Sequence, residues 1–385
     1  MTPLSNSRGN VRRHPDWDLD PDFLTVNHGS FGATPIAVRA AQRTWQDRME
    51  RQASRFVTTE LGPALRKAAG VLADFLDARP EDVAFVDNAT TGCNAVLRSM
   101  TFEAGDEIVV LSHVYGAVRN AVRHTAQATG ARVVEARIPF PDPSPAAMIA
   151  AVAAILGAAT RLVVLDHITS ASALLVPVAD IVRLAHAAGA KVLIDGAHAP
   201  GQIDLSLTDI GADWYVGNCH KWLCAPKGCA FLHARDQAAL HPVVISHGYG
   251  QGFLAEFDWT GTTDFSRFLA VEEAIAHHRR LGGPALRARN RSLAAEAAER
   301  LARRLGTRTG GGPVVSAAMG TVRLPVGDPT PEHALAIRQA LVRAGTDAPV
   351  HALDGGLWLR LSAFAYNEPG DYDRLGDIVA GVLAA

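Results

Sequence analysis

Short runs of β-branched residues alternate with alanine-rich stretches of helical spacing between residues 83 and 233 of this 385-residue chain. Each apolar run fits one strand, and each stretch between two runs fits one helix. This alternation predicts βαβ units on a mainly parallel sheet that helices cover on both faces. The predicted strands are Val83–Val86, Glu107–Leu111, Ala131–Ala136, Arg161–Asp166, Lys191–Ile194, Trp214–Val216 and Cys229–His233. The predicted helices between them are Thr91–Met100, Ala117–Thr129, Pro145–Leu156 and Val178–Ala188.

The pattern changes on both sides of this region. A helical pattern precedes it, and after residue 263 a long helical stretch leads into three glycines, Gly310–Gly312, which we expect to form a loop. Strands and helices without regular alternation follow, as in a smaller α+β domain. Because one hydrophobic core rarely serves a chain of this length, we expect two domains. We predict an N-terminal segment over 1–34 that packs with the small domain, a large domain over 35–263 and a small domain over 264–385.

Charge and cysteine content exclude several classes of function. The formal net charge of -2 argues against binding to nucleic acid or to an anionic membrane. The N-terminal residues have no apolar core, so we expect neither a signal peptide nor a membrane span. The spacing of the four cysteines is not that of a zinc or redox site. We therefore predict reduced thiols and a cytoplasmic location.

Polar residues follow three of the predicted strands, at the sheet edge where α/β proteins bind ligands. The first strand leads into Asp87–Gly92, a turn whose N–H groups and hydroxyls suit a phosphate, or cap a helix. Asp195 ends another strand, as a partner for a cationic nitrogen or as a helix cap. Lys221 follows a third strand and, if buried, is a nucleophile and base; it could instead reach the surface, and Lys227 is the other candidate amine. Together the three signals predict a site for an anionic, pyridine-bearing cofactor that forms imines.

The chain resembles the fold-type I enzymes that use pyridoxal 5'-phosphate (PLP), within the aminotransferase class V superfamily. Its motifs are similar to those of the isopenicillin N epimerase-like group, which includes fungal hercynylcysteine sulfoxide lyases. The resemblance covers nearly the whole chain. The motifs that carry it are VNHGSFGATP at Val26–Pro35, DNATTG at Asp87–Gly92, DHITS at Asp166–Ser170, DGAHAPG at Asp195–Gly201, GNCHKWLCAPKG at Gly217–Gly228, WTGTTD at Trp259–Asp264 and LRLSAFAYN at Leu359–Asn367.

The resemblance implies a role for each cofactor-binding residue. Lys221 forms a Schiff base with PLP and moves protons at the substrate α-carbon, and Asp195 pairs with the pyridinium nitrogen. The phosphate is held by Thr90, Thr91, His220 and Asn218.

The remaining cofactor contacts depart from the pattern of the superfamily. Tyr115 stands where an aromatic ring stacks on the cofactor, with His113 as the competing candidate. Ser170 and His198 stand where related cysteine desulfurases have an Asn and a Gln near the ring hydroxyl. Thr262 resembles the residue that reaches the phosphate of the neighbouring subunit, which implies a homodimer with shared active sites.

On the substrate side, the resemblance implies a small amino-acid-like substrate. Arg360 would bind its carboxylate through a bidentate pair. Asn27, His28 and Ser30 would line the substrate side, although a glycine-bounded turn there could be purely structural.

Several reactions fit this cofactor, and we rank C–S β-lyase action on a cysteine S-conjugate first. β-Elimination needs Lys221, an electron sink and a leaving group. Epimerisation comes second, since it needs an acid on the opposite face and the sequence identifies none. Decarboxylation-linked oxidative deamination or transamination follows. Cysteine desulfurases need a mobile cysteine in the C-terminal half, and this chain has none after Cys229.

Three interpretations from other classes remain open. The residues Asp166, His167, Asp195, His198 and His220 could form a metal-hydrolase cluster, but the helical H-E-x-x-H motif is missing and Lys221 has no role in it. A serine hydrolase built on Ser30 lacks the G-x-S-x-G elbow. A PLP-fold ligand sensor without catalysis would not need Lys221, Asp195 and Arg360 together.

Overall fold

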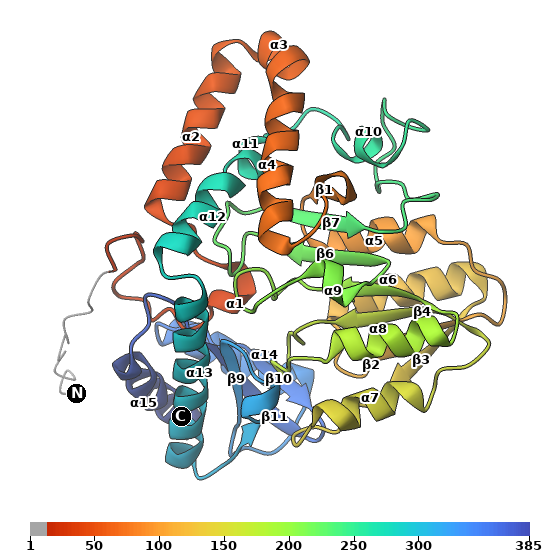
Figure 1. The fold of residues 1–385 in the computed structure, drawn as a ribbon. Helices are drawn as coiled ribbons and strands as arrows, with labels where there is room; N and C mark the ends of the chain where they lie inside the picture. The colour runs from red at the N-terminus through yellow and green to blue at the C-terminus, as the bar shows by residue number, and fades with distance from the viewer. Residues whose placement is uncertain (1–13) are drawn as a thin grey trace.

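A seven-stranded sheet forms the centre of the larger domain in this computed structural model, which describes residues 14–385 (Figure 1). The strand order is β1-β7-β6-β5-β4-β2-β3, and β7 runs antiparallel to both of its neighbours while the other adjacent pairs are parallel. The mainly parallel sheet expected from the sequence is therefore confirmed. The strands are β1 (Val83–Val86), β2 (Glu107–Leu111), β3 (Arg132–Ala136), β4 (Thr160–Asp166), β5 (Lys191–Asp195), β6 (Trp214–Asn218) and β7 (Ala230–Ala234).

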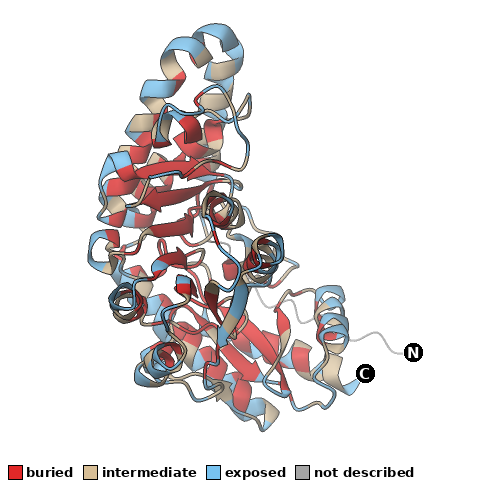
Figure 2. Cartoon of the chain, turned by 90° about the vertical axis from the view of Figure 1, so that its right-hand side faces the viewer, coloured by how far each residue is buried: buried red, intermediate tan, exposed pale blue. Residues whose placement is uncertain are grey.

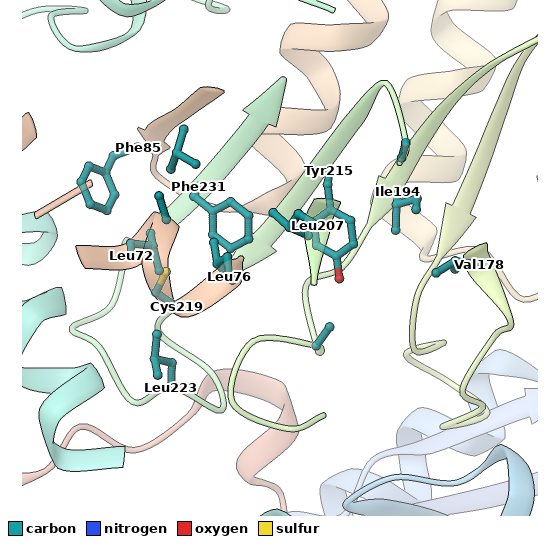
Figure 3. Packing of buried hydrophobic residues seen from close by; sticks show 14 of the residues in the cluster. Leu72, Leu76, Phe85, Val178, Ile194, Leu207, Tyr215, Cys219, Leu223 and Phe231 are labelled. Atoms are coloured by element: carbon teal, nitrogen blue, oxygen red, sulfur yellow. The ribbon is translucent and has the colours of Figure 1, made fainter. Parts of the chain in front are cut away.

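Apolar side chains from both faces of this sheet are buried, which is why its strands read as continuous hydrophobic runs. Along β2, Val109 and Leu111 belong to one core cluster, whereas Ile108 and Val110 belong to another. Figure 2 shows the sheet as a buried layer, and Figure 3 shows side chains packed in the first of these clusters. The helices that connect the strands are α5 (Ala89–Ser99), α6 (Gly116–Thr129), α7 (Pro145–Ala153), α8 (Val178–Ala187) and α9 (Leu207–Ile210).

The hydrophobic core of the large sheet continues beyond residue 264, where the sequence analysis placed the domain boundary. Phe265, Phe268 and Val271 are buried in the same core cluster as the large sheet, and the chain turns away only at Gly282 and Gly283, both with positive φ. Glycine at positive φ breaks the single helix expected over this region. The remaining helices of the large domain are α1 (His28–Phe31), α2 (Ile36–Arg51), α3 (Ala53–Arg55), a π-helical turn (Phe56–Glu60), α4 (Leu61–Leu76), a 3-10 turn (Pro80–Asp82), α10 (Phe253–Phe257), α11 (Ser266–Leu269) and α12 (Val271–Arg280).

The smaller domain is an antiparallel sheet covered by helices. Its strand order is β10-β11-β9-β8. The glycine loop expected at Gly310–Gly312 is wrong in its first residue, because Gly310 pairs with Thr321 in the sheet. The elements are α13 (Pro284–Leu305), β8 (Thr309–Gly310), a 3-10 turn (Pro313–Val315), β9 (Met319–Arg323), α14 (Pro331–Arg343), β10 (Val350–Leu353), β11 (Gly356–Ser362) and α15 (Pro369–Ala384).

The described part of the N-terminal segment packs with the small domain. Leu24 and Val26 are buried in the core of that domain, and the Leu24 N–H donates to the Gly345 carbonyl at 2.8 Å. Residues 1–13 of the predicted segment lie outside the described residues. In residues 14–385, no helix combines the length and the hydrophobicity needed to cross a membrane.

Candidate active site

The carboxyl ends of three adjacent parallel strands bring the predicted polar residues together. Asp166 ends β4, Asp195 ends β5 and Asn218 ends β6, and Asp166 and Asp195 are directly paired in register. Lys221 follows β6 by three residues. Because neighbouring strands end at the same edge, residues far apart in the sequence face one site.

Lys221 presents its amine to this edge in a low-dielectric setting. Burial lowers the pKa of Lys221 to about 8; the negative charge of Asp195 opposes this shift, and the positive charge of Arg360 adds to it. The Lys221 Nζ atom lies 3.3 Å from Nε2 of His198. A lysine whose pKa is lowered in this way is a stronger nucleophile at neutral pH than one in water.

The hydrogen bonds of His198 fix which of its ring nitrogens carries the proton. The Trp222 indole Nε1–H, which can only donate, lies 3.3 Å from Nδ1 of His198. Burial lowers the pKa of His198 well below its usual value, so the ring is neutral. The proton is then on Nε2 and points at the Lys221 amine, which can accept it only when that amine is neutral.

His28 supports the loop that carries Lys221. Its Nε2 lies 3.0 Å from the Lys221 carbonyl oxygen, and its Nδ1 lies 2.9 Å from the Tyr366 hydroxyl. Its ring stacks on Phe364 at a centroid distance of 3.7 Å. Both ring nitrogens of His28 therefore contact the protein, and a place for His28 on the substrate side stays a prediction.

Gly32 allows the N-terminal segment to approach the cofactor lysine closely. A Cβ atom at this position would lie 2.1 Å from the His220 carbonyl oxygen and 2.8 Å from that of Lys221. The φ angle of Gly32 is +67°, in the region that favours glycine. The turn of the N-terminal motif therefore holds the backbone that carries Lys221.

The N-terminus of α5 has the arrangement expected of a phosphate turn. Asn88 caps the helix by accepting from the Thr91 N–H at 2.9 Å, and Asn218 Oδ1 accepts from the Ala89 N–H at 2.9 Å. Among residues 14–385, neither the N–H nor the hydroxyl of Thr90 has a hydrogen-bond partner. Asn218 thus anchors the turn, while Thr90 is free to bind an anion at a helix N-terminus.

His220 lies beside this turn with a defined tautomer. Its Nδ1 donates to the Cys229 carbonyl at 3.0 Å, since a carbonyl only accepts. Burial lowers the pKa of His220 to about 4, which leaves the ring neutral with a lone pair on Nε2.

Of the two candidates for the stacked ring, the structure favours Tyr115. Tyr115 lies at the start of α6 with a 43% exposed side chain, and its N–H donates to Asp166 Oδ1 at 3.1 Å. His113 is buried instead, with Nδ1 at 2.8 Å from the Ser172 hydroxyl and Nε2 at 3.2 Å from Asp354. Neither nitrogen of His113 is free, whereas the Tyr115 ring is open.

Arg360 is a buried cation that only neutral groups contact. Nη1 donates to the Ser170 carbonyl at 2.6 Å and lies 3.3 Å from its hydroxyl, and Nη2 donates to Asn27 Oδ1 at 3.0 Å and Ser30 Oγ at 2.8 Å. Its Nε atom is buried without a partner. Burial, assisted by Arg338, lowers the pKa of Arg360 to about 10. A buried guanidinium in this state fits an incoming carboxylate.

A second layer of charge orients the Arg360 site. Asp347 accepts from Arg338 Nε at 2.7 Å and Nη2 at 2.9 Å, and from Asn27 Nδ2 at 2.6 Å. The hydrogen bond from Asn27 Nδ2 to Asp347 turns the side-chain carbonyl oxygen of Asn27 toward Arg360. Asn27 and Ser30 therefore orient the guanidinium of Arg360. Ser170 also contacts Arg360, whereas the sequence analysis expected it near the hydroxyl of the cofactor ring.

The structure gives little support to the hydrolase alternatives. Among residues 14–385, no three His, Cys, Asp or Glu side chains lie together as metal ligands, and His167 bonds Tyr215 at 2.8 Å. Ser30 Oγ donates to Asn27 Oδ1 and accepts from Arg360, so no histidine activates it. Thr262 is exposed.

Sequence reasoning missed the residues that act through others. Trp222, Tyr366 and Asp347 each orient a site residue, and two of these three contacts join positions more than 300 residues apart. Trp222 and Tyr366 lie in motifs that the sequence analysis singled out, but the motifs did not indicate the roles of these two residues, and Asp347 lies in none of the motifs.

The site fits PLP. It contains the amine of Lys221, the carboxylate of Asp195 at the neighbouring strand end, the phosphate turn at Thr90 and the guanidinium of Arg360, which no carboxylate contacts. This fold and site define a fold-type I PLP-dependent enzyme. The sequence model of the family described as aminotransferase class-V matches residues 39–375, and the chain belongs to this family.

Named relatives fall into two groups by reaction. The chain is 34% identical to the probable chloroplastic L-cysteine desulfhydrase of Arabidopsis thaliana, over 94% of this chain and 84% of the relative. It is 35% identical to the isopenicillin N epimerase of Amycolatopsis lactamdurans, over 98% of both chains. Among solved structures, the cystine C–S lyase C-DES in complex with cysteine persulfide superposes with a TM-score of 0.79 at 22% identity, covering 93% of this chain and 97% of that one.

Proposed function

We propose that this protein is a C–S β-lyase that acts on cysteine or a cysteine S-conjugate, with PLP bound covalently to Lys221. The observation that carries the proposal is the pairing of one depressed-pKa amine with one uncompensated buried guanidinium, Arg360. Similarity to proteins named L-cysteine desulfhydrase supports the lyase reaction.

Each residue then has one task. Bound PLP supplies the electron sink that stabilises negative charge at the substrate α-carbon. Arg360 holds the substrate carboxylate, and Asp195 keeps the ring nitrogen charged. Lys221 takes the α-proton, after which the C–S bond breaks with its electron pair on sulfur. Thr90 and Thr91, with Asn218 as their anchor, hold the phosphate, and Tyr115 covers the ring.

The cysteines of the chain favour release of sulfur over its transfer to the enzyme. All four, Cys93, Cys219, Cys224 and Cys229, are buried. Burial raises the pKa of Cys93, Cys219 and Cys224, so these thiols are poor nucleophiles. Sulfur is therefore expected to leave with the product.

Epimerisation is the second candidate, and Tyr115 favours it. The Tyr115 hydroxyl has no hydrogen-bond partner among residues 14–385, and Tyr115 is 43% exposed. Because a phenol O–H can donate a proton, Tyr115 is our candidate for the acid opposite Lys221.

Product analysis separates the two reactions. The holoenzyme is incubated in deuterated buffer with L-cysteine and with cysteine S-conjugates. A lyase releases sulfide or thiol with pyruvate, and K221A releases neither. If the α-carbon takes up deuterium with inversion and no pyruvate forms, the protein is an epimerase and the lyase proposal fails.

We also propose a homodimer in which Thr262 of the partner subunit reaches the phosphate turn. Exposed apolar side chains support this: Val244, Ile245 and Tyr249 lie in one loop and are 56%, 55% and 60% exposed. Val244 also lines a cavity with Thr91 and Thr263, next to the turn. A monomer in sedimentation equilibrium of the holoenzyme would contradict the dimer.

A further inference from the structure

Asp166 carries a buried oxygen that nothing in the described fold satisfies. The side chain ends β4, directly in register with Asp195, and is 2% exposed. Its Oδ1 accepts from the Tyr115 N–H at 3.1 Å. Its Oδ2 is buried without a hydrogen-bond partner. An ionised carboxylate left in this state would be strongly destabilised.

The missing partner is not bulk solvent, because the Oδ2 atom of Asp166 has almost no exposed surface. We therefore look for the partner within the protein. The simplest donor is a proton on the Asp166 carboxyl group itself.

The charges around Asp166 favour this proton. Burial raises the pKa of Asp166 well above its usual value, and the negative charge of Asp195 raises it further. The N–H groups of Tyr115 and of Asp166 itself, together with the charge of Arg119, oppose the increase in the pKa of Asp166. The negative charge that Asp166 would carry when ionised would raise the pKa of Lys221 and that of the Cys93 thiol.

Asp195, in contrast, is placed to carry the negative charge of the pair. Its Oδ1 accepts from the Ala197 N–H at 3.0 Å, and Lys221 lowers its pKa against the effect of burial. Two carboxyl groups at paired strand ends cannot both ionise without a large cost. The carboxyl group that its surroundings stabilise more in the ionised form is that of Asp195, so Asp195 carries the negative charge.

We propose that Asp166 is a positioning residue that stays protonated and donates a hydrogen bond to the Asp195 carboxylate. This bond fixes the carboxylate and lowers its basicity, so the proton stays on the ring nitrogen of the cofactor. Without it, Asp195 competes for that proton and the electron sink weakens. The inference rests on the proposed pairing of Asp195 with the ring nitrogen.

Two substitutions test the bond. D166N keeps an oxygen for the Tyr115 N–H and an N–H for Asp195, so we expect kcat to stay within about threefold of the native value. D166L has similar volume and no donor, and we expect kcat to fall about ten- to a hundredfold with little change in KM. Equal losses in both variants would overturn the proposal, as would an unchanged kcat in D166L.

Infrared spectra of the full-length holoenzyme provide a readout besides activity. We expect a carbonyl band of a protonated carboxylic acid at neutral pH, which shifts on labelling aspartate with 13C and is lost in D166N. Absence of this band means that Asp166 is ionised and overturns the proposal even if D166L does not fold. A band from protein that binds no PLP would instead refute the proposed function while the protonated Asp166 stands.

Discussion

The nucleophile of this site is the Lys221 amine, and its environment changes the pH at which it loses its proton. Because burial lowers the pKa of Lys221 to about 8, the neutral amine becomes the major form above that pH and the ammonium below it. We expect the rate of PLP uptake by the apoenzyme, followed by absorbance, to rise with pH and reach half its plateau near pH 8. K227A is the control and should leave the midpoint unchanged, since Lys227 is exposed and bonds Thr34. A midpoint near the usual lysine value would contradict this environment.

Arg360 is the residue whose loss should affect mainly substrate binding. Replacing it with alanine removes the charge placed for a carboxylate, so we expect KM for L-cysteine to rise about 10- to 100-fold, with a smaller effect on kcat. Cysteamine, which lacks the carboxylate, is the matched control, and its binding to the PLP-loaded enzyme should change little. Equal weakening of both compounds would mean that R360A disturbs the fold.

Single residues also show how far the sequence can be interpreted. Lys221 and Asp195 were found because both follow strands, and strand ends of one sheet edge meet. The contacts of His28 with Tyr366 and the Lys221 carbonyl were not predicted, because no local sequence pattern contains them. The motif at Val26–Pro35 indicated that His28 matters. Only the fold shows which groups His28 contacts.

At the scale of elements, the turn after α1 is the tightest contact with the lysine loop. G32A would place a methyl group against the His220 carbonyl, so we expect Tm to fall, by an amount that corresponds to about 2–3 kcal/mol, together with the fraction of lysine-bound cofactor. Gly62 in α4 is the matched control, because a Cβ atom there meets nothing within 4 Å. G62A should raise stability by about 0.5–1 kcal/mol. A similar response in both variants would contradict the role of the contact.

The elements themselves were largely predictable. The predicted first and last residues of β1 and β2 match the structure. Both strands are short apolar runs with turn residues on either side, and this pattern defines buried strands well. The helix expected over residues 266–305 is three helices in the structure: it is interrupted at Ala270, between α11 and α12, and at Gly282 and Gly283, between α12 and α13. Local propensity did not show that its first part belongs to the core of the large domain.

Across the whole molecule, the N-terminal segment and the small domain are joined through Asp347. D347A leaves Arg338 and Asn27 without their acceptor, so we expect stability to fall by about 1–3 kcal/mol and KM for the amino acid to rise with kcat nearly unchanged. Q339A, at an exposed position of α14 next to Arg338, should change neither quantity. Unfolding by denaturant and steady-state kinetics measure the two effects. A fall in stability with an unchanged KM would mean that Asp347 does not orient the substrate site.

The central claim is that Lys221 alone carries the cofactor, and reductive trapping tests it most directly. The PLP-loaded protein is reduced with borohydride, digested, and its labelled peptide is sequenced by mass spectrometry. We expect the pyridoxyl group on the peptide that contains Lys221, and no label in K221A. Label on Lys67, Lys191 or Lys227 of the native protein, or none at all, would contradict the account.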